Sequence, residues 1–217
     1  MLSRPLLLGH RGARATKSIP ENTFASFDQA LADGCDGFEF DVRVTADGQA
    51  VVGHDPQSRG VKIACATIQQ VSWLPLLQDV LARYRDSAFL DIELKVPGLE
   101  PMILNLLREY PPSRGFVVSS FLPEILRSVR GKSPVVPLGL ICETKSQLDG
   151  WRQSAVEYVI PHQTLASTEL IRKLREAGKK ILVWTVNNQA GMRRFAKAGV
   201  DGIISDDTKL LGEILRR

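Results

Sequence analysis

Short apolar runs alternate along the chain with amphipathic segments, which is the pattern of repeated strand and helix units. Eight apolar runs are bounded by Gly, Pro or charge, and we predict strands over Leu6–Gly9, Gly37–Val42, Ala88–Leu94, Gly115–Ser119, Val135–Ile141, Tyr158–Ile160, Ile181–Val186 and Gly202–Ile204. Helical periodicity between them predicts helices over Thr23–Asp33, Leu76–Arg85, Leu99–Glu109, Leu122–Arg130, Lys145–Arg152, Thr168–Ala177, Gln189–Ala198 and Thr208–Arg216. Eight strand–helix pairs predict an α/β fold, a closed (β/α)8 barrel.

Two segments depart from this alternation. The run Ala50–Gly53 follows an Asp-Gly turn directly after the second strand, so we expect a hairpin extension of that strand. The stretch from Gln57 to Ser72 has no strong periodicity, and we expect a short excursion above the barrel mouth. The chain of 217 residues is near the lower limit of roughly 200 for such a barrel, so we expect one domain over residues 1–217.

Composition narrows the class of protein without giving its function. The 44% hydrophobic and 24% charged residues are typical of a soluble globular protein. No dense basic stretch is interleaved with aromatic residues, so a nucleic-acid partner is not expected. Cys35, Cys65 and Cys142 lack metal or redox spacing, and the apolar runs are too short for a signal peptide or a membrane span. We expect a cytoplasmic protein with no stable membrane insertion; its oligomeric state is not indicated.

Charged side chains collect at the ends of the first three predicted strands, where barrel enzymes place catalytic groups. These residues are His10, Arg11, Glu39, Asp41, His54, Asp55, Asp91, Glu93 and Lys95. Glu39 and Asp41 are two positions apart, so they point to the same face, as do Asp91, Glu93 and Lys95. Several buried carboxylates would each cost several kcal/mol without a compensating cation.

The carboxylates therefore indicate a divalent cation. A set of oxygen ligands suits Mg²⁺ or Ca²⁺, whereas zinc would more often recruit His or Cys. The alternative is a solvated edge strand on which Lys95 forms a salt bridge. His10 and His54 fall beside the carboxylates and can supply a general acid and a general base, while Arg11 and Lys95 can contact phosphate oxygens. His162 follows a proline and has no acidic neighbour, so a structural role is expected.

Two further motifs allow more than one interpretation. Pro20-Glu21-Asn22-Thr23 precedes the first helix, and we expect Asn22 or Thr23 to cap it. Trp184-Thr185-Val186-Asn187 ends the seventh strand. Trp184 either lines a pocket or packs in the core, and Asn187 is placed to begin the next helix.

Taken in order, these motifs resemble the glycerophosphodiester phosphodiesterase family. The resemblance rests on His10-Arg11-Gly12, Pro20-Glu21-Asn22-Thr23, Glu39-Phe40-Asp41-Val42, Gly53-His54-Asp55, Asp91-Ile92-Glu93-Leu94-Lys95, Trp184-Thr185-Val186-Asn187 and Gly199-Val200-Asp201-Gly202-Ile203-Ile204. It implies a TIM-barrel enzyme that uses Mg²⁺ or Ca²⁺ to cleave glycerophosphodiesters to glycerol 3-phosphate and an alcohol. By the same resemblance, the metal ligands are Glu39, Asp41 and Glu93, the acid/base pair is His10 and His54, and the phosphate contacts are Arg11 and Lys95. Trp184, from its place at a strand end, is a further candidate substrate contact.

The chain departs from the family pattern at two places. A longer insertion is reduced here to Gln57–Ser72, so we expect the alcohol side of the substrate to be weakly enclosed. The usual Thr-Asp-x-Pro appears as Ser205-Asp206-Asp207-Thr208, which we expect to cap the last helix. Alternatives are a lysophospholipase D-like or lyase activity on the same barrel, or a catalytically silent binding protein. A silent protein would be expected to have lost one of the seven polar residues to which the resemblance gives a role. All seven are present: His10, Arg11, Glu39, Asp41, His54, Glu93 and Lys95.

Overall fold

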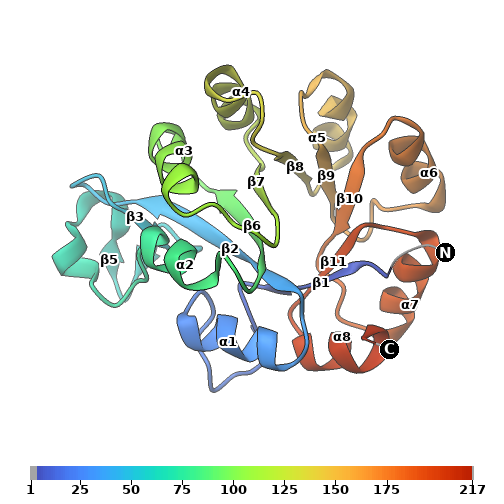
Figure 1. The fold of residues 1–217 in the computed structure, drawn as a ribbon, viewed down its shortest axis with the longest axis horizontal. Helices are drawn as coiled ribbons and strands as arrows, with labels where there is room; N and C mark the ends of the chain where they lie inside the picture. Colours follow the sequence, from blue (N-terminus) through green and yellow to red (C-terminus); the bar gives the residue numbers. More distant parts are fainter. Residues whose placement is uncertain (1–3, 217) are drawn as a thin grey trace.

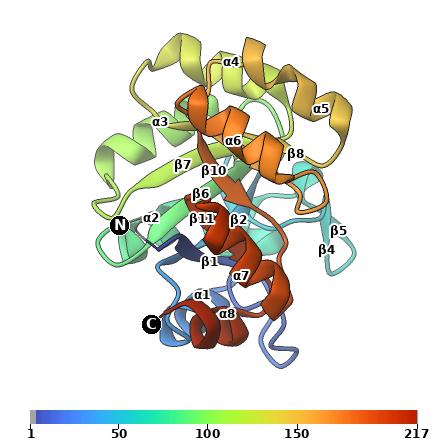
Figure 2. The same cartoon turned by 90° about the vertical axis from the view of Figure 1, so that its right-hand side faces the viewer.

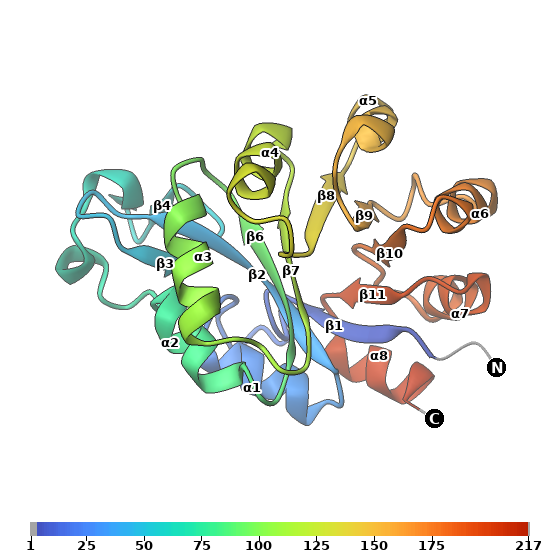
Figure 3. The ribbon, with the colours of Figure 1, turned by 45° about the horizontal axis from the view of Figure 1, so that its top comes forward.

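The structure, a computed structural model, describes residues 4–216, in which eight parallel strands close into a barrel. Figures 1 and 3 show the strands in a ring with the helices outside them. Around the ring the order is β1, β2, β6, β7, β8, β9, β10 and β11, and β11 pairs with β1 to close it. The strands are β1 Leu6–His10, β2 Gly37–Val44, β6 Phe89–Leu94, β7 Phe116–Ser120, β8 Leu138–Cys142, β9 Tyr158–Pro161, β10 Lys180–Val183 and β11 Gly202–Ser205.

Eight α-helices follow the barrel strands or, for α2, the excursion after β2 (Figure 2). They are α1 Phe24–Ala32, α2 Leu77–Tyr84, α3 Glu100–Glu109, α4 Pro123–Lys132, α5 Lys145–Asp149, α6 Thr168–Glu176, α7 Gln189–Ala198 and α8 Thr208–Leu215. The prediction of a (β/α)8 barrel is confirmed. In the described part of the chain, no helix is both long and apolar enough to cross a membrane.

Two predicted strand boundaries are wrong by three residues, and the others lie within two residues of those in the structure. The fifth barrel strand begins at Leu138 rather than Val135, because Val135 is 84% exposed and Pro137 has no N–H for the ladder. The seventh strand ends at Val183, and Trp184 forms only an isolated bridge to His162. The fifth predicted helix, Lys145–Arg152, shortens to α5 and continues as a 3-10 turn, η3 Gly150–Gln153.

The excursion after β2 is more ordered than its sequence indicated. The predicted hairpin is confirmed, because β3 (Ala50–Val52) pairs antiparallel with β2. A second small hairpin follows, β4 Gln57–Ser58 with β5 Val61–Lys62, and then two 3-10 turns, η1 Ile63–Cys65 and η2 Ile68–Val71. This segment lies at the left in Figure 1.

Side-chain alternation along β2 separates the core from the site. Phe38 and Phe40 point outward into a buried aromatic cluster, in which the Phe27 and Phe38 rings stack with centroids 4.2 Å apart. Burying each such ring stabilises the fold by roughly 1.5–3 kcal/mol. Glu39 and Asp41, on the opposite face, point into the barrel. The outward aromatic packing therefore fixes the direction of the two carboxylates.

Candidate active site

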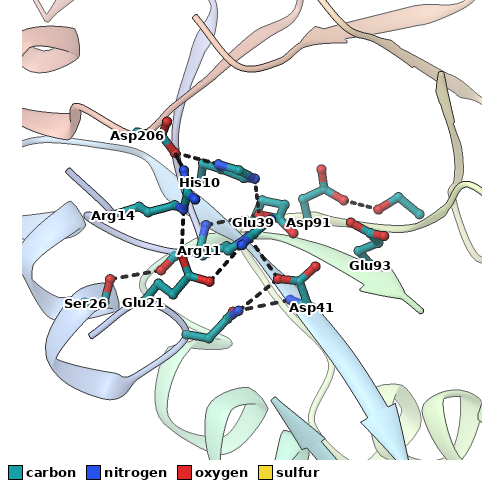
Figure 4. Close-up of polar contacts among 12 residues, drawn as sticks. His10, Arg11, Arg14, Glu21, Ser26, Glu39, Asp41, Asp91, Glu93 and Asp206 are labelled. Carbon is teal, nitrogen blue, oxygen red and sulfur yellow. Dashed lines mark hydrogen bonds and ion pairs between the residues drawn. The ribbon is translucent and has the colours of Figure 1, made fainter. Parts of the chain in front are cut away.

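Three buried carboxylates meet at the carboxyl end of the barrel. Strand register places Glu39 of β2 beside Asp91 of β6, and Asp41 beside Glu93 one layer higher. Each of Glu39, Asp41 and Glu93 has one oxygen within 4.8 Å of an oxygen of the other two (Figure 4). The predicted alternation is thus confirmed, and the solvated edge-strand alternative is wrong, because all three are buried inside the closed sheet.

Two cations offset part of this negative charge. Lys95 Nζ lies 2.6 Å from Glu93 Oε1 and 3.3 Å from Asp41 Oδ1, and Arg11 Nε lies 3.3 Å from Asp41 Oδ2. Burial would raise the pKa of Asp41, but Lys95 and Arg11 outweigh burial and lower it. Burial, with a further contribution from Asp41, raises the pKa of Glu93 to about 7. Lys95 and Arg11 therefore stabilise the charged form of Asp41, and they balance the charges of Glu39 and Glu93 only in part.

The donor set fits a divalent cation. Glu39 Oε1 and Asp41 Oδ1 are buried and accept no hydrogen bond from residues 4–216; the 3.3 Å contact from Lys95 to Asp41 lacks hydrogen-bonding geometry. Burial, followed by repulsion from Asp41, raises the pKa of Glu39 well above its ordinary value. Oxygens with open lone pairs and unbalanced charge are the ligands of Mg²⁺ and Ca²⁺.

His10 is oriented by a carboxylate from the last strand end. Its Nδ1 lies 2.7 Å from Asp206 Oδ1, and its Nε2 lies 3.8 Å from Glu39 Oε2. Asn187 Nδ2 donates to Asp206 at 2.6 Å, and Arg14 Nη1 donates at 3.2 Å. Burial would raise the pKa of Asp206, but the hydrogen bond from His10 and these neighbours lower it to about 2. A charged Asp206 can only accept, so Nδ1 carries the proton and Nε2 is directed toward Glu39.

Residues of the loop after β1 donate hydrogen bonds to the carboxylate cluster. Arg11 adopts a positive φ of 53°, donates its backbone N–H to Glu39 Oε2 at 3.0 Å, and donates Nη1 to Glu21 at 2.8 Å. Asn22, also at positive φ, donates Nδ2 to Asp41 Oδ2 at 2.9 Å. The cap of α1 is Thr23, which accepts from the backbone of Ser26. Of the two residues expected to cap, Asn22 instead supports a carboxylate of the cluster.

The two remaining histidines differ in position. His54 follows β3, is 34% exposed, and places its Nδ1 2.7 Å from Asp55 Oδ1. His162 places its Nδ1 2.8 Å from Thr164 Oγ1 and packs edge-on against Trp184, outside the lining of the main cavity. The structure thus brings His10 and His54 to the carboxylate cluster and leaves His162 aside.

A cavity of about 390 Å³ opens above the carboxylates. Polar side chains line it at the ends of β1, β2 and β6, and mainly apolar ones line it at β7 to β11, where the Trp184 and Phe121 rings meet edge-on with centroids 5.6 Å apart. Its lining residues are His10, Arg11, Glu39, His54, Asp91, Glu93, Lys95, Phe121, Ile141, Glu143, Gln147, Ile160, Trp184 and Ile204. Trp184 also donates Nε1 to the Ile160 carbonyl at 3.0 Å, so it both lines the cavity and is fixed by the core.

Several residues of the site were not predicted. Asp206 and Glu21 orient His10 and Arg11, and Asn187 holds Asp206 rather than beginning α7, which Asn188 caps. Asp206 could have been found in the same way as the charged residues of the first three strands, because it too directly follows a barrel strand. The expected cap of the last helix is confirmed, through the neighbouring Asp207.

Comparison with known proteins gives a consistent result. The model of the glycerophosphoryl diester phosphodiesterase family matches residues 10–105 and 93–210. A glycerophosphodiester phosphodiesterase of Caldanaerobacter subterraneus is 30% identical and the match covers 99% of both chains; a putative one of Bacillus subtilis, YhdW, is 32% identical over 92% of this chain and 93% of its own. A putative glycerophosphoryl diester phosphodiesterase structure from Silicibacter pomeroyi superimposes with a TM-score of 0.88 at 25% identity, covering 100% of this chain and 94% of its own. The chain belongs to the glycerophosphoryl diester phosphodiesterase family of enzymes.

Proposed function

We propose that the chain hydrolyses glycerophosphodiesters to glycerol 3-phosphate and an alcohol, using one divalent cation, Mg²⁺ or Ca²⁺. One observation carries the proposal: a cluster of three carboxylates lies at a cavity that two of them line together with two cations and two histidines, at the carboxyl end of the barrel. The family match and the names of the relatives support the same reaction class.

Glu39, Asp41 and Glu93 would hold the cation, since an oxygen of each converges with the others, and Glu39 and Asp41 each have a buried oxygen without a hydrogen-bond partner among the described residues. When bound, such a cation neutralises phosphate charge and orients the diester. Arg11 and Lys95 present positive charge to the same cavity, where both are mostly buried and already aligned by Asp41 and Glu93. These two side chains therefore bind the phosphate oxygens with little reorganisation.

His10 and His54 are the proton-transfer pair in this proposal. Each has Nδ1 engaged by an aspartate, Asp206 or Asp55, so each offers Nε2 for exchange. One histidine takes the proton of the attacking oxygen, and the other donates a proton to the departing alkoxide. Trp184 lines the side of the cavity opposite the carboxylates and limits the position of the substrate.

The experiment is a panel of phosphodiesters assayed with and without EDTA, with the released alcohol as readout. Glycerophosphodiesters should be hydrolysed only in the presence of metal. Purified His10→Ala protein should lose at least about 99% of the activity in the same assay, which excludes a contaminant. The panel includes lysophosphatidylcholine, because part of the cavity is lined by apolar side chains that an acyl chain would contact. Faster release of choline from that lipid than from any glycerophosphodiester would replace the proposal with the lysophospholipase D activity.

The setting of the reaction is also a proposal. We propose one catalytic domain over residues 1–217, acting in the cytoplasm on a small-molecule diester and not on a nucleic acid. Cys35 and Cys142 are buried free thiols, a state that a reducing compartment preserves. Cell fractionation with antibody detection tests the location.

A further inference from the structure

A second cavity of about 240 Å³ lies on the other side of His54. It is bounded by the loop at residues 20–23 and by the excursion after β3, and Trp73, Leu74 and Pro75 also line it. Among the described residues, His54 is the one histidine that lines both this cavity and the main one. The shortened Gln57–Ser72 segment was expected to leave the alcohol side weakly enclosed, yet part of it forms a wall here.

The wall is held in place by its own hairpin. Arg59 and Gly60 connect β4 to β5 with φ values of 50° and 80°, as a two-residue type I′ turn requires. The turn places the Arg59 guanidinium 4.8 Å from the centre of the Trp73 ring. Trp73 is fixed in turn, because its Nε1 donates to Ser58 Oγ at 2.9 Å. The cavity thus has a preformed aromatic and cationic side.

The charges around this cavity are unequally compensated. Glu21 already accepts from Arg11 and Arg14, and Asp55 contacts His54. Within residues 4–216, Arg59 has its stacking contact with Trp73 and no carboxylate at ion-pair distance. When His54 carries the proton that it donates in the proposed reaction, it neutralises Asp55, and the charge left without a partner in the lining is the positive charge of Arg59. It repels an ammonium group and offers N–H donors to hydroxyl oxygens.

Resting on the proposed function, we infer that the second cavity binds the departing alcohol and favours a neutral polyol over a quaternary ammonium alcohol. A phosphodiester has two ester arms on one phosphorus, and His54 stands between the two cavities. An arm in the second cavity places its ester oxygen beside His54. The P–O bond to that arm breaks, its electron pair remains on the alcohol oxygen, and a proton from His54 completes the alcohol. A P–O bond forms to the attacking oxygen, whose proton passes to His10.

The test compares glycerophosphoglycerol with glycerophosphocholine by kcat/KM in the metal-loaded enzyme. The wild-type protein should favour the glycerol diester about three- to tenfold, the scale of one exposed charge. Arg59→Glu should improve the choline diester and shift the ratio toward it by about tenfold, mainly through KM. Lys62→Glu is the matched control, because it makes the same change of charge on the same hairpin outside the cavity lining.

The possible outcomes distinguish failure of the proposed subsite from failure of the proposed hydrolase activity. Equal shifts in Arg59→Glu and Lys62→Glu, or no shift in either, would overturn the subsite while leaving the hydrolase intact. Failure of the wild-type protein to cleave either diester would instead overturn the proposed function. Thermal melting of both variants shows whether the hairpin still folds, and Arg59→Gln, which removes the charge without reversing it, should give an intermediate ratio.

Discussion

Replacing Asp206 by Asn tests whether His10 depends on a carboxylate for its orientation. The carboxylate lies 2.7 Å from His10 Nδ1 and also receives hydrogen bonds from Asn187 and Arg14. Asn has nearly the same shape but no charge, and its amide can present a donor to Nδ1, which would move the imidazole proton from Nδ1 to Nε2 and leave Nε2 unable to accept a proton. We expect kcat to fall by about 10²–10⁴-fold, the range for losing one proton-transfer partner, with KM nearly unchanged.

The same substitution has a calculable effect on stability. The pKa of Asp206 is lowered to about 2 in the folded protein, against an ordinary value near 3.9. At about 1.4 kcal/mol per unit, the charged carboxylate contributes about 2–3 kcal/mol to folding. Because the folded pKa is depressed, this contribution is present above about pH 4 and is lost as pH falls through about 2. Asp206→Asn should therefore lower Tm by about 4–12 °C at pH 7 and by much less at pH 2–3.

Asp207→Asn is the control for this prediction. Asp207 is adjacent in sequence and caps α8 by accepting from Leu210, but its described contacts do not include His10. Its substitution should cost no more than about 1 kcal/mol and leave kcat within about threefold. Steady-state kinetics, thermal melting at two pH values and ¹⁵N shifts of the histidine ring nitrogens make the comparison. The reasoning fails if Asp206→Asn keeps the wild-type His10 tautomer and kcat, or if both variants lose kcat equally.

Three further predictions follow from the proposed site. Exhaustive chelation should abolish turnover and lower Tm, and Mg²⁺ or Ca²⁺ should restore both. If elemental analysis showed the protein to be metal-free and it still turned over at the full rate, the cation would have no part in the reaction. His10→Ala and His54→Ala should each reduce kcat by about 10²–10⁴-fold with little change in melting temperature, whereas His162→Ala should leave kcat nearly unchanged. If His162 were essential and His54 dispensable, the assignment of His10 and His54 as the proton-transfer pair would be wrong. Diesters of ethanol or propanol that lack the glycerol moiety should be rejected in kcat/KM comparisons, while any preference among glycerophosphodiester head groups should stay below about 10³-fold.

Features that depend only on residues close together in the sequence were predictable. The alternation of Phe38, Glu39, Phe40 and Asp41 repeats every two positions, so one strand reveals both the core face and the site face. Boundaries were less predictable where apolar composition continued past the strand. Val135 is apolar and β-branched, yet it is exposed because the ladder starts beyond Pro137.

The pairing of His10 with Asp206 shows why part of the site was missed. The two residues are 196 positions apart, and they meet because β11 pairs with β1, with Gly9 opposite Ser205. A closed barrel requires its first and last strands to be neighbours, so the predicted fold already implied that the residues after each strand lie at one end. It did not indicate which of two adjacent aspartates points inward. Both fit a helix cap, because capping needs only a backbone N–H three residues ahead, whereas contact with His10 depends on the side-chain direction that barrel closure imposes on Asp206.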